Sequence, residues 1–155
     1  TDFTKKNKIK KPLALKVSPD IPEREISNII ELIKKFKIHG VVVSNTTDKN
    51  RENLTGLHKS EIGGLSGMPL SEISNRLIKK FYKETKGEIS IIGVGGISSG
   101  STAFEKLKSG ANLLQLYTGM IYEGPSIVKK IKAELIDILK KERIKNVSEI
   151  VGTGS

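Results

Sequence analysis

The strongest constraint on this sequence is a repeated alternation of short apolar runs with amphipathic stretches. The runs are rich in Val, Ile and Leu and cover residues 13–17, 41–43, 89–94 and 111–117. Such runs are typical of strands buried on both faces, as in parallel sheets. Between them, apolar residues recur three and four positions apart, as on the buried face of a helix. The pattern predicts an α/β protein with four parallel strand–helix units.

Capping signals predict where two of the helices begin. Asp20 and Glu23 form a capping-box signature for the first helix, and Gly40 is predicted to end it. Thr102 and Glu105 form the same signature for a short helix after the third strand. The chain has 155 residues, a length that suits one domain with one core.

Two architectures fit this pattern: an open doubly wound sheet, and part of a barrel of eight strand–helix units. A dinucleotide-binding sheet would need a Gly-x-Gly-x-x-Gly turn after its first strand. The turn here is Ser18-Pro19-Asp20. The sequence therefore argues against a Rossmann-type cofactor site.

Composition excludes several kinds of chemistry. The chain has no cysteine, so disulfides, thiolate nucleophiles and iron–sulfur clusters are ruled out. His39 and His58 are too few for a His-only zinc site, and no metal is expected. No apolar run approaches the roughly 18 residues of a membrane-spanning helix, and no signal peptide is visible, so the chain as given is expected to be soluble, cytosolic or peripheral.

The chain carries an excess of positive charge. Its 27 basic and 17 acidic residues leave a formal net charge of +10. The lysines are scattered along predicted helix faces, aromatic residues make up 5% of the chain, and Trp is absent. Nucleic-acid binding is therefore not expected. A Lys-rich solvated surface is the simpler interpretation, and a basic nucleic-acid-binding or scaffolding protein is kept as a rival.

Polar residues at the ends of the first two strands are candidates for a ligand site, because ligands gather at the carboxyl ends of parallel strands. Lys16 lies inside an apolar run, where a charge is costly unless it faces a polar cavity. A lysine that protects an edge strand from aggregation is the alternative. Ser44, Asn45 and Thr46 follow the second run, and ordinary turn chemistry is the alternative for Asn45 and Thr46.

Glycine-rich turns follow the third and fourth strands. Gly95 and Gly96, with the predicted helix start at residues 98–100, offer backbone N–H groups to an anion. Tyr117 and Thr118 end the fourth strand and add further donors. Barrel enzymes commonly bind phosphate between two such neighbouring loops. We expect a phosphate site here.

A long loop separates the second strand from the second helix. It covers residues 46–69, and loops of that length in compact domains are functional or disordered. Residues 63–67 make it glycine-rich near its end. This element closes over the same ligand or is simply flexible.

Five segments of the chain resemble class 2 dihydroorotate dehydrogenase in order and spacing: residues 15–20, 44–47, 63–70, 92–97 and 115–118. The resemblance is to the C-terminal half of that enzyme. It implies the C-terminal half of a (β/α)8 barrel, which as a whole has about 250 residues. The expected organisation is a basic lead-in (1–11), a half-barrel with FMN- and substrate-binding elements (12–152) and a tail (153–155).

The resemblance also implies a function. Enzymes of this class use FMN to oxidise (S)-dihydroorotate to orotate, with quinone as the electron acceptor, in de novo pyrimidine (UMP) biosynthesis. The whole protein is then expected to be peripheral on the cytoplasmic side of the inner membrane, and the fragment itself soluble. The alternative is a phosphate-binding half-barrel without flavin, acting as a binding module.

The resemblance assigns roles to eight residues. Lys16 would support flavin reduction electrostatically, and Asn45 and Thr46 would bind the substrate. Ser44 stands where the family often has Thr. The residues expected to bind FMN are Lys16, Ser44, Gly67, Gly96, Tyr117 and Thr118.

In class 2 members the catalytic base is a serine of the N-terminal half, which has no counterpart in this chain. Ser66 and Ser98 are weak candidates to replace it, because serine near glycine is usually a turn residue. The fragment alone is therefore expected to be inactive. Its unpaired strand edges predict either binding to a complementary N-terminal half or self-association.

Overall fold

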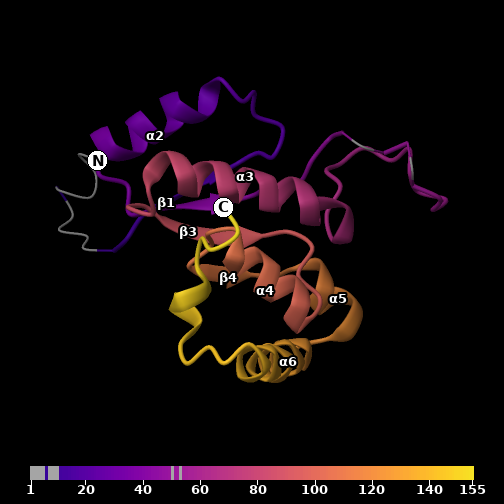
Figure 1. The fold of residues 1–155 in the computed structure, drawn as a ribbon. Helices are drawn as coiled ribbons and strands as arrows, with labels where there is room; N and C mark the ends of the chain where they lie inside the picture. Colours follow the sequence, from indigo (N-terminus) through magenta and orange to yellow (C-terminus); the bar gives the residue numbers. More distant parts are fainter. Residues whose placement is uncertain (1–5, 7–10, 50, 53) are drawn as a thin grey trace.

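The computed structural model describes residue 6 and residues 11–49, 51–52 and 54–155. The described strands are β1 (Ala14–Val17), β2 (Gly40–Val43), β3 (Ser90–Val94) and β4 (Leu113–Gln115). The α-helices are α2 (Glu25–Lys35), α3 (Ser71–Thr85), α4 (Gly100–Lys108), α5 (Thr118–Glu123) and α6 (Ile127–Lys141) (Figure 1). Two 3-10 helices are η1 (Met68–Leu70) and η2 (Val147–Ile150).

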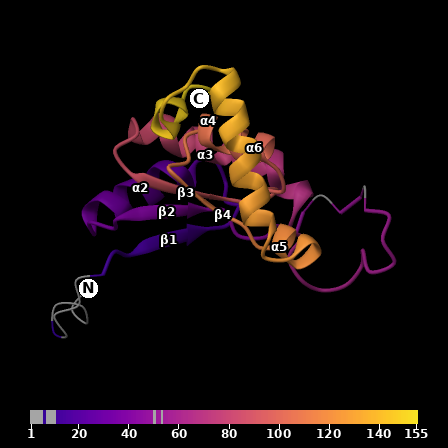
Figure 2. The ribbon, with the colours of Figure 1, turned by 90° about the horizontal axis from the view of Figure 1, so that it is seen from below.

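The strands form one parallel sheet in the order β1-β2-β3-β4. Each strand pairs with the strand that follows it in the chain. Helices α2, α3 and α4 lie on one side of the sheet, and none of the helices α2–α6 covers the opposite side (Figure 2). This confirms the predicted α/β class of four parallel strand–helix units and is consistent with part of a (β/α)8 barrel.

The main core lies between the sheet and helices α2 and α3. Val43 of β2 and Ile91 of β3 are fully buried there against the helices. The helices contribute Ile26, Ile30, Ile33, Leu77, Ile78 and Phe81. A smaller cluster joins Ile97 to Ala103, Ile127 and Ile131 beneath α6. The predicted apolar stripes of α2 and α3 therefore face the sheet, whereas that of α6 packs mainly against α4.

The predicted start of the first helix is wrong. Helix α2 begins at Glu25 after Arg24, which makes no side-chain cap, so Asp20 and Glu23 form no capping box. The helix also ends earlier than predicted, at Lys35, and Gly40 is instead the first residue of β2. The predicted capping box does not form because the Asp20 carboxylate accepts hydrogen bonds from the loop after β2 instead.

Three further boundaries differ from the prediction. The capping box of α4 is formed by Ser99 and Thr102, not by Thr102 and Glu105. Strand β4 covers three residues, because the chain turns directly into α5, a helix that the sequence pattern did not predict. The 3-10 helix η2 was also missed.

The ends of the chain can be described only in part. Most of the predicted lead-in, residues 1–11, lies outside the described residues. The tail is ordered against α4, since Gly152 N donates to Leu107 O and Gly154 N donates to Lys108 O. Among the described residues, none of the helices has the length and apolar character needed to cross a membrane.

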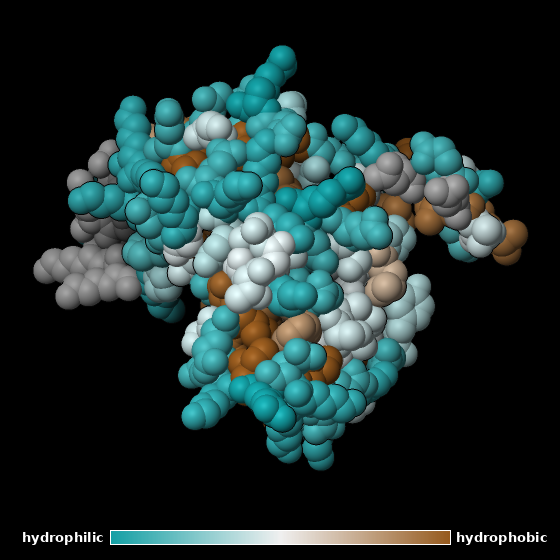
Figure 3. All heavy atoms as spheres, viewed as in Figure 1, coloured by the Kyte–Doolittle hydropathy of each residue, from teal (hydrophilic) through white to brown (hydrophobic). Residues whose placement is uncertain are grey.

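Hydrophilic side chains cover most of the face shown in Figure 3, over α2 and α3. Helix α3 carries the basic residues Arg76, Lys79 and Lys83. Over the described residues, no three His, Asp or Glu side chains cluster closely enough to hold a metal ion.

Candidate functional site

One cavity lies at the carboxyl ends of the four strands. Its volume is about 490 Å³, within the range of about 300–1,000 Å³ typical of small-molecule sites. The loop that contains η1 forms one wall, and the start of α5 forms another. All eight residues singled out in the sequence line it: Lys16, Ser44, Asn45, Thr46, Gly67, Gly96, Tyr117 and Thr118.

The glycines after β3 form a cradle of backbone donors with the start of α5. Gly96 has φ +73°, and a Cβ there would lie 2.7 Å from Ser71 Cα, so only glycine fits. The N–H groups of Gly95, Gly96, Thr118 and Gly119 donate to no acceptor within the described part of the chain. Such a set of free donors suits a phosphate or a similar oxyanion.

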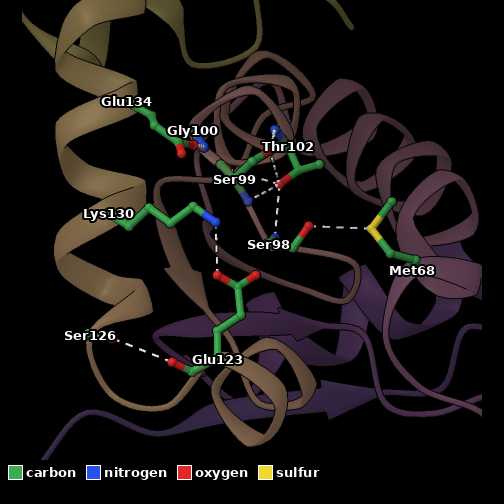
Figure 4. A network of polar contacts seen from close by, with 9 residues as sticks. All are labelled: Met68, Ser98, Ser99, Gly100, Thr102, Glu123, Ser126, Lys130 and Glu134. Atoms are coloured by element: carbon green, nitrogen blue, oxygen red, sulfur yellow. Dashed lines mark hydrogen bonds and ion pairs between the residues drawn. The ribbon is translucent and has the colours of Figure 1, made fainter.

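The start of α4, predicted as part of the anion site, already holds an internal anion. Glu134 Oε2 of α6 accepts from Gly100 N at 2.6 Å, and Ser99 Oγ accepts from Thr102 N (Figure 4). Thr102 Oγ1 also accepts from the N–H groups of Ser98 and Ser99. These bonds satisfy the N–H groups of Ser98, Ser99, Gly100 and Thr102, so the expectation of free anion-binding donors at residues 98–100 is wrong.

Lys16 lies on the sheet face opposite helices α2 and α3. The pairing register places it beside Val42, which pairs in turn with Ile92 of β3. Its side chain is exposed and lines the cavity. Because β1 is also an edge strand, the lysine occupies both of the positions considered from the sequence; its place on the cavity wall favours the site.

Asn45 and Thr46 are exposed on the cavity wall. Hydrogen bonds to β1 and to the turn after β1 hold the loop that carries them. Asn45 N donates to Val17 O at 2.8 Å, and Asn45 Oδ1 accepts from Thr46 N at 2.9 Å. The buried Thr47 donates to Asp20 Oδ1 at 2.6 Å. The loops after β1 and β2 are thus joined directly beneath the two residues.

The glycine-rich end of the long loop contacts α5. Thr118 Oγ1 donates to Ser66 Oγ at 2.9 Å, which brings Gly67 and Thr118 to the same wall of the cavity. Ser98 Oγ donates to Met68 Sδ at 3.5 Å (Figure 4). Neither serine has a carboxylate or imidazole partner among the described residues, so nothing there activates either as a base.

A carboxylate also lies at the cavity rim. Glu123 of α5 lines the cavity, and Lys130 of α6 donates to its Oε2 at 2.8 Å (Figure 4). The same contact raises the pKa of Lys130 and keeps it charged. The ion pair reduces the repulsion that Glu123 would otherwise exert on an anion.

Lys106 of α4 is a buried polar residue that the sequence analysis missed. Its Nζ donates to Asn75 Oδ1 at 2.7 Å and to Ser74 Oγ at 3.1 Å. Its position could have been noticed, because Ala103 and Leu107 place it on the apolar stripe of α4.

Comparisons with known proteins place this arrangement in a family. A family model described as dihydroorotate dehydrogenase matches residues 2–139. Dihydroorotate dehydrogenase (quinone) of Trichodesmium erythraeum is 44% identical over 96% of the chain and 41% of its own length. The mitochondrial dihydroorotate dehydrogenase (quinone) of Mus musculus is 41% identical over 92% of the chain and 36% of its length.

Solved structures agree with this result. Ligand-free DHODH from Eimeria tenella has a TM-score of 0.88 and 37% identity, with 92% of this chain and 40% of that chain covered. The same enzyme in complex with ferulenol has a TM-score of 0.87, with 38% of that chain covered. This chain spans about two fifths of the length of these relatives. It belongs to the dihydroorotate dehydrogenase family, in the quinone-linked class that its sequence resembles.

Proposed function

We propose that this chain supplies the FMN- and substrate-binding half of a dihydroorotate dehydrogenase. The whole enzyme would oxidise (S)-dihydroorotate to orotate and pass the electrons to a quinone, in de novo pyrimidine (UMP) biosynthesis. One observation carries the proposal: the eight residues with expected roles, spread from Lys16 to Thr118, line a single cavity.

The donor cradle after β3 and β4 supports FMN as the cofactor. The phosphate of FMN would accept from the N–H groups of Gly96 and Thr118, which are free within the described residues. Tyr117 stands beside them, and Ser44 and Gly67 line the remainder of the cavity, where the ring system would lie. Apolar side chains such as Ile97 and Leu116 suit a flat aromatic ring.

Lys16 is suited to support flavin reduction. When bound, FMN supplies the chemistry of hydride acceptance from the substrate. The ammonium of Lys16, at the cavity wall, would offset the negative charge that accumulates on the reduced ring. The backbone of β1 fixes where this side chain starts, at the edge of the cavity.

Asn45 and Thr46 are suited to hold the pyrimidine ring. The ring presents both donors and acceptors along its amide edges, and Asn offers both in one side chain. Asn45 Oδ1 accepts from Thr46 N, which leaves the Nδ2 group of Asn45 as a donor toward the cavity wall. Thr46 adds a hydroxyl.

We propose that the substrate proton is removed by a base that neither Ser66 nor Ser98 supplies. Ser66 accepts from Thr118, and Ser98 donates to Met68, so neither is poised to abstract a proton. We therefore propose that the chain alone is inactive. The missing base would come from a complementary N-terminal half, for which the sheet edges at β1 and β4 and the exposed side chains Leu113 and Tyr117 provide a surface. The whole protein would be peripheral on the cytoplasmic side of the inner membrane. Quinone would reach it at that membrane surface.

Ligand titration distinguishes the flavin enzyme from the phosphate-binding module without flavin. We expect the purified chain, alone or with its complementary half, to quench FMN fluorescence. Riboflavin, which lacks the phosphate, should bind at least tenfold more weakly. Binding of inorganic phosphate with no response to FMN would support the binding module and overturn the proposal.

A lysine variant tests the electron-transfer role. The variant Lys16→Met is made in the full-length protein that contains this chain. We expect the variant to bind FMN, but dihydroorotate should reduce the bound FMN at least a hundredfold more slowly. Lys79→Met, on the solvent side of α3, is the matched control. Reduction of Lys16→Met at a near-normal rate would contradict the assigned role.

A further inference from the structure

Lys106 is a fully buried lysine that the proposed chemistry does not use. Its side chain is 0% exposed, and burial lowers the pKa of its ammonium to about 8. Its Nζ bonds only to neutral oxygens, Ser74 Oγ and Asn75 Oδ1, among the described residues. A buried charge with no carboxylate partner is costly. Filling space on α4 does not account for it, because methionine would fill the same volume.

The hydrogen bonds of Lys106 lead to the two strand ends that border the cavity. Ser74 Oγ lies 2.6 Å from Val94 O and 3.3 Å from Val43 O, the last carbonyls of β3 and β2. Val94 O also accepts from Ser44 N at 3.2 Å. One serine hydroxyl thus connects the ends of two neighbouring strands.

The ammonium fixes the direction of that hydroxyl. A serine has one hydroxyl hydrogen, and its oxygen can also accept. Because Lys106 donates to the oxygen, the hydrogen of Ser74 is left to donate to Val94 O, with Val43 O beside it. Without the ammonium, the hydroxyl would be free to rotate away from the strands.

The stem of Lys106 crosses β3 next to the site. A Cβ at Gly93 would lie 2.8 Å from Lys106 Cγ and 2.9 Å from Lys106 Cδ, so the side chain lies flat against that glycine. Gly93 directly precedes Val94, and Gly95 and Gly96 follow. The lysine therefore contacts β3 immediately before the donor cradle.

We propose that Lys106 is a positioning residue for the FMN-binding end of the sheet. Acting through Ser74, it holds the Val43 and Val94 carbonyls, and with them the backbone that carries Ser44 after β2 and Gly96 after β3. The inference rests on the proposed function, because its effect is expected in FMN affinity.

The test compares four variants of the protein read from the full open reading frame. Lys106→Met keeps the stem and removes the ammonium, and Ser74→Ala removes only one oxygen. Lys108→Met, on the exposed side of α4, is the matched control. The FMN dissociation constant and the urea unfolding midpoint are measured for each, and for the double variant Lys106→Met with Ser74→Ala.

We expect Lys106→Met and Ser74→Ala each to weaken FMN binding about tenfold, and Lys108→Met to bind as the wild type does. The double variant should also lose only about tenfold, because two residues of one relay are not additive. If the role of Lys106 were purely structural, Lys106→Met would lower the urea unfolding midpoint and leave FMN affinity unchanged. That result, or additive losses in the double variant, would overturn the proposal.

Two outcomes separate this inference from the proposed function. If the wild type binds no FMN, both fail. If the wild type binds FMN and Ser74→Ala binds it within twofold of the wild type, only the role of Lys106 fails. Should Lys106→Met not fold, Ser74→Ala alone decides the question by the same twofold criterion.

Discussion

The carboxylate of Asp20 accepts a 2.6 Å hydrogen bond from Oγ1 of Thr47, across 27 positions of the chain. Asp20 Oδ2 also accepts from Asp48 N at 3.0 Å. Through these bonds, the turn after β1 holds the loop after β2. Asn45 and Thr46, the expected substrate ligands, lie immediately before this joint.

Removing that carboxylate should affect the substrate more than the cofactor. We expect Asp20→Ala to lower the free energy of unfolding by about 1–3 kcal/mol, because the buried Thr47 hydroxyl loses its acceptor. The KM for dihydroorotate should rise while FMN affinity changes little. Urea unfolding and steady-state kinetics of the whole enzyme measure both effects. Asp48→Ala is the control, and an unchanged KM for Asp20→Ala would refute the link.

Gly96 should tolerate no side chain. In Gly96→Ala, the Cβ would lie 2.4 Å from Ser71 Cβ and 2.7 Å from Ser71 Cα, at a φ of +73°. We expect FMN affinity to fall by at least tenfold, since the cradle and the start of α3 must move apart. Gly56→Ala is the matched control, because nothing lies within 4 Å of its added Cβ. Equal FMN affinity of the two variants in a fluorescence titration would count against the cradle.

Glu134 should stabilise α4 by occupying its N-terminus. We expect Glu134→Ala to lower the free energy of unfolding by about 1–2 kcal/mol, since the carboxylate accepts from Gly100 N and interacts with the helix dipole. Glu134→Gln keeps an acceptor and should lose less. Asp137→Asn on the same helix provides the control. Chemical denaturation of Glu134→Ala with a wild-type midpoint would show that the contact contributes nothing.

Burial of Lys106 should make stability depend on pH. Its pKa is lowered from 10.5 to about 8 in the folded chain, so between these values the unfolded chain binds more protons. The free energy of unfolding should therefore rise from pH 8 toward pH 10.5, by up to about 3 kcal/mol from this group alone.

The difference between wild type and Lys106→Met isolates this effect, because other groups titrate in both proteins. Urea unfolding at pH 7, 8, 9 and 10 measures that difference. We expect the wild type to gain stability relative to the variant as pH rises. A difference that stays constant with pH would show that the lysine keeps its ordinary pKa.

The sequence was sufficient to predict the four strands, because each lies in a mainly apolar run, and the long helices, because each carries a stripe at helical spacing. It also predicted where the cavity residues lie, since Lys16, Ser44 and Gly96 follow from the ends of those strands. Their roles remain predictions, carried by the family resemblance.

Long-range bonds could not be predicted from local patterns. The signature at Asp20 and Glu23 looks like a capping box, but Asp20 bonds to Thr47 and Glu23 pairs with Lys80 of α3. Likewise, the sequence suggests that the helix start at Gly100 is open to an anion, but Gly100 N donates to the carboxylate of Glu134, 34 positions later. In both cases a residue with a plausible nearby partner is used by a distant one.

Helix α5 was missed for a different reason. Its six residues, Thr118–Glu123, are too few to show helical periodicity, and Gly119 and Gly124 suggest a turn. Lys106 was missed because a lysine counts as polar in any hydropathy pattern. Its burial depends on Ser74 and Asn75 of another helix.

Because each strand pairs with its successor, the sheet can grow in the order in which a ribosome delivers the chain. Every new strand finds its neighbour already emerged, although the pairing residues are far apart in the chain: Gly40 of β2 pairs with Ser90 of β3. The cavity, in contrast, is complete only after the last strand has been made. It needs Lys16 from the first strand and Thr118 after the last, so ligand binding would report that synthesis has passed all four units.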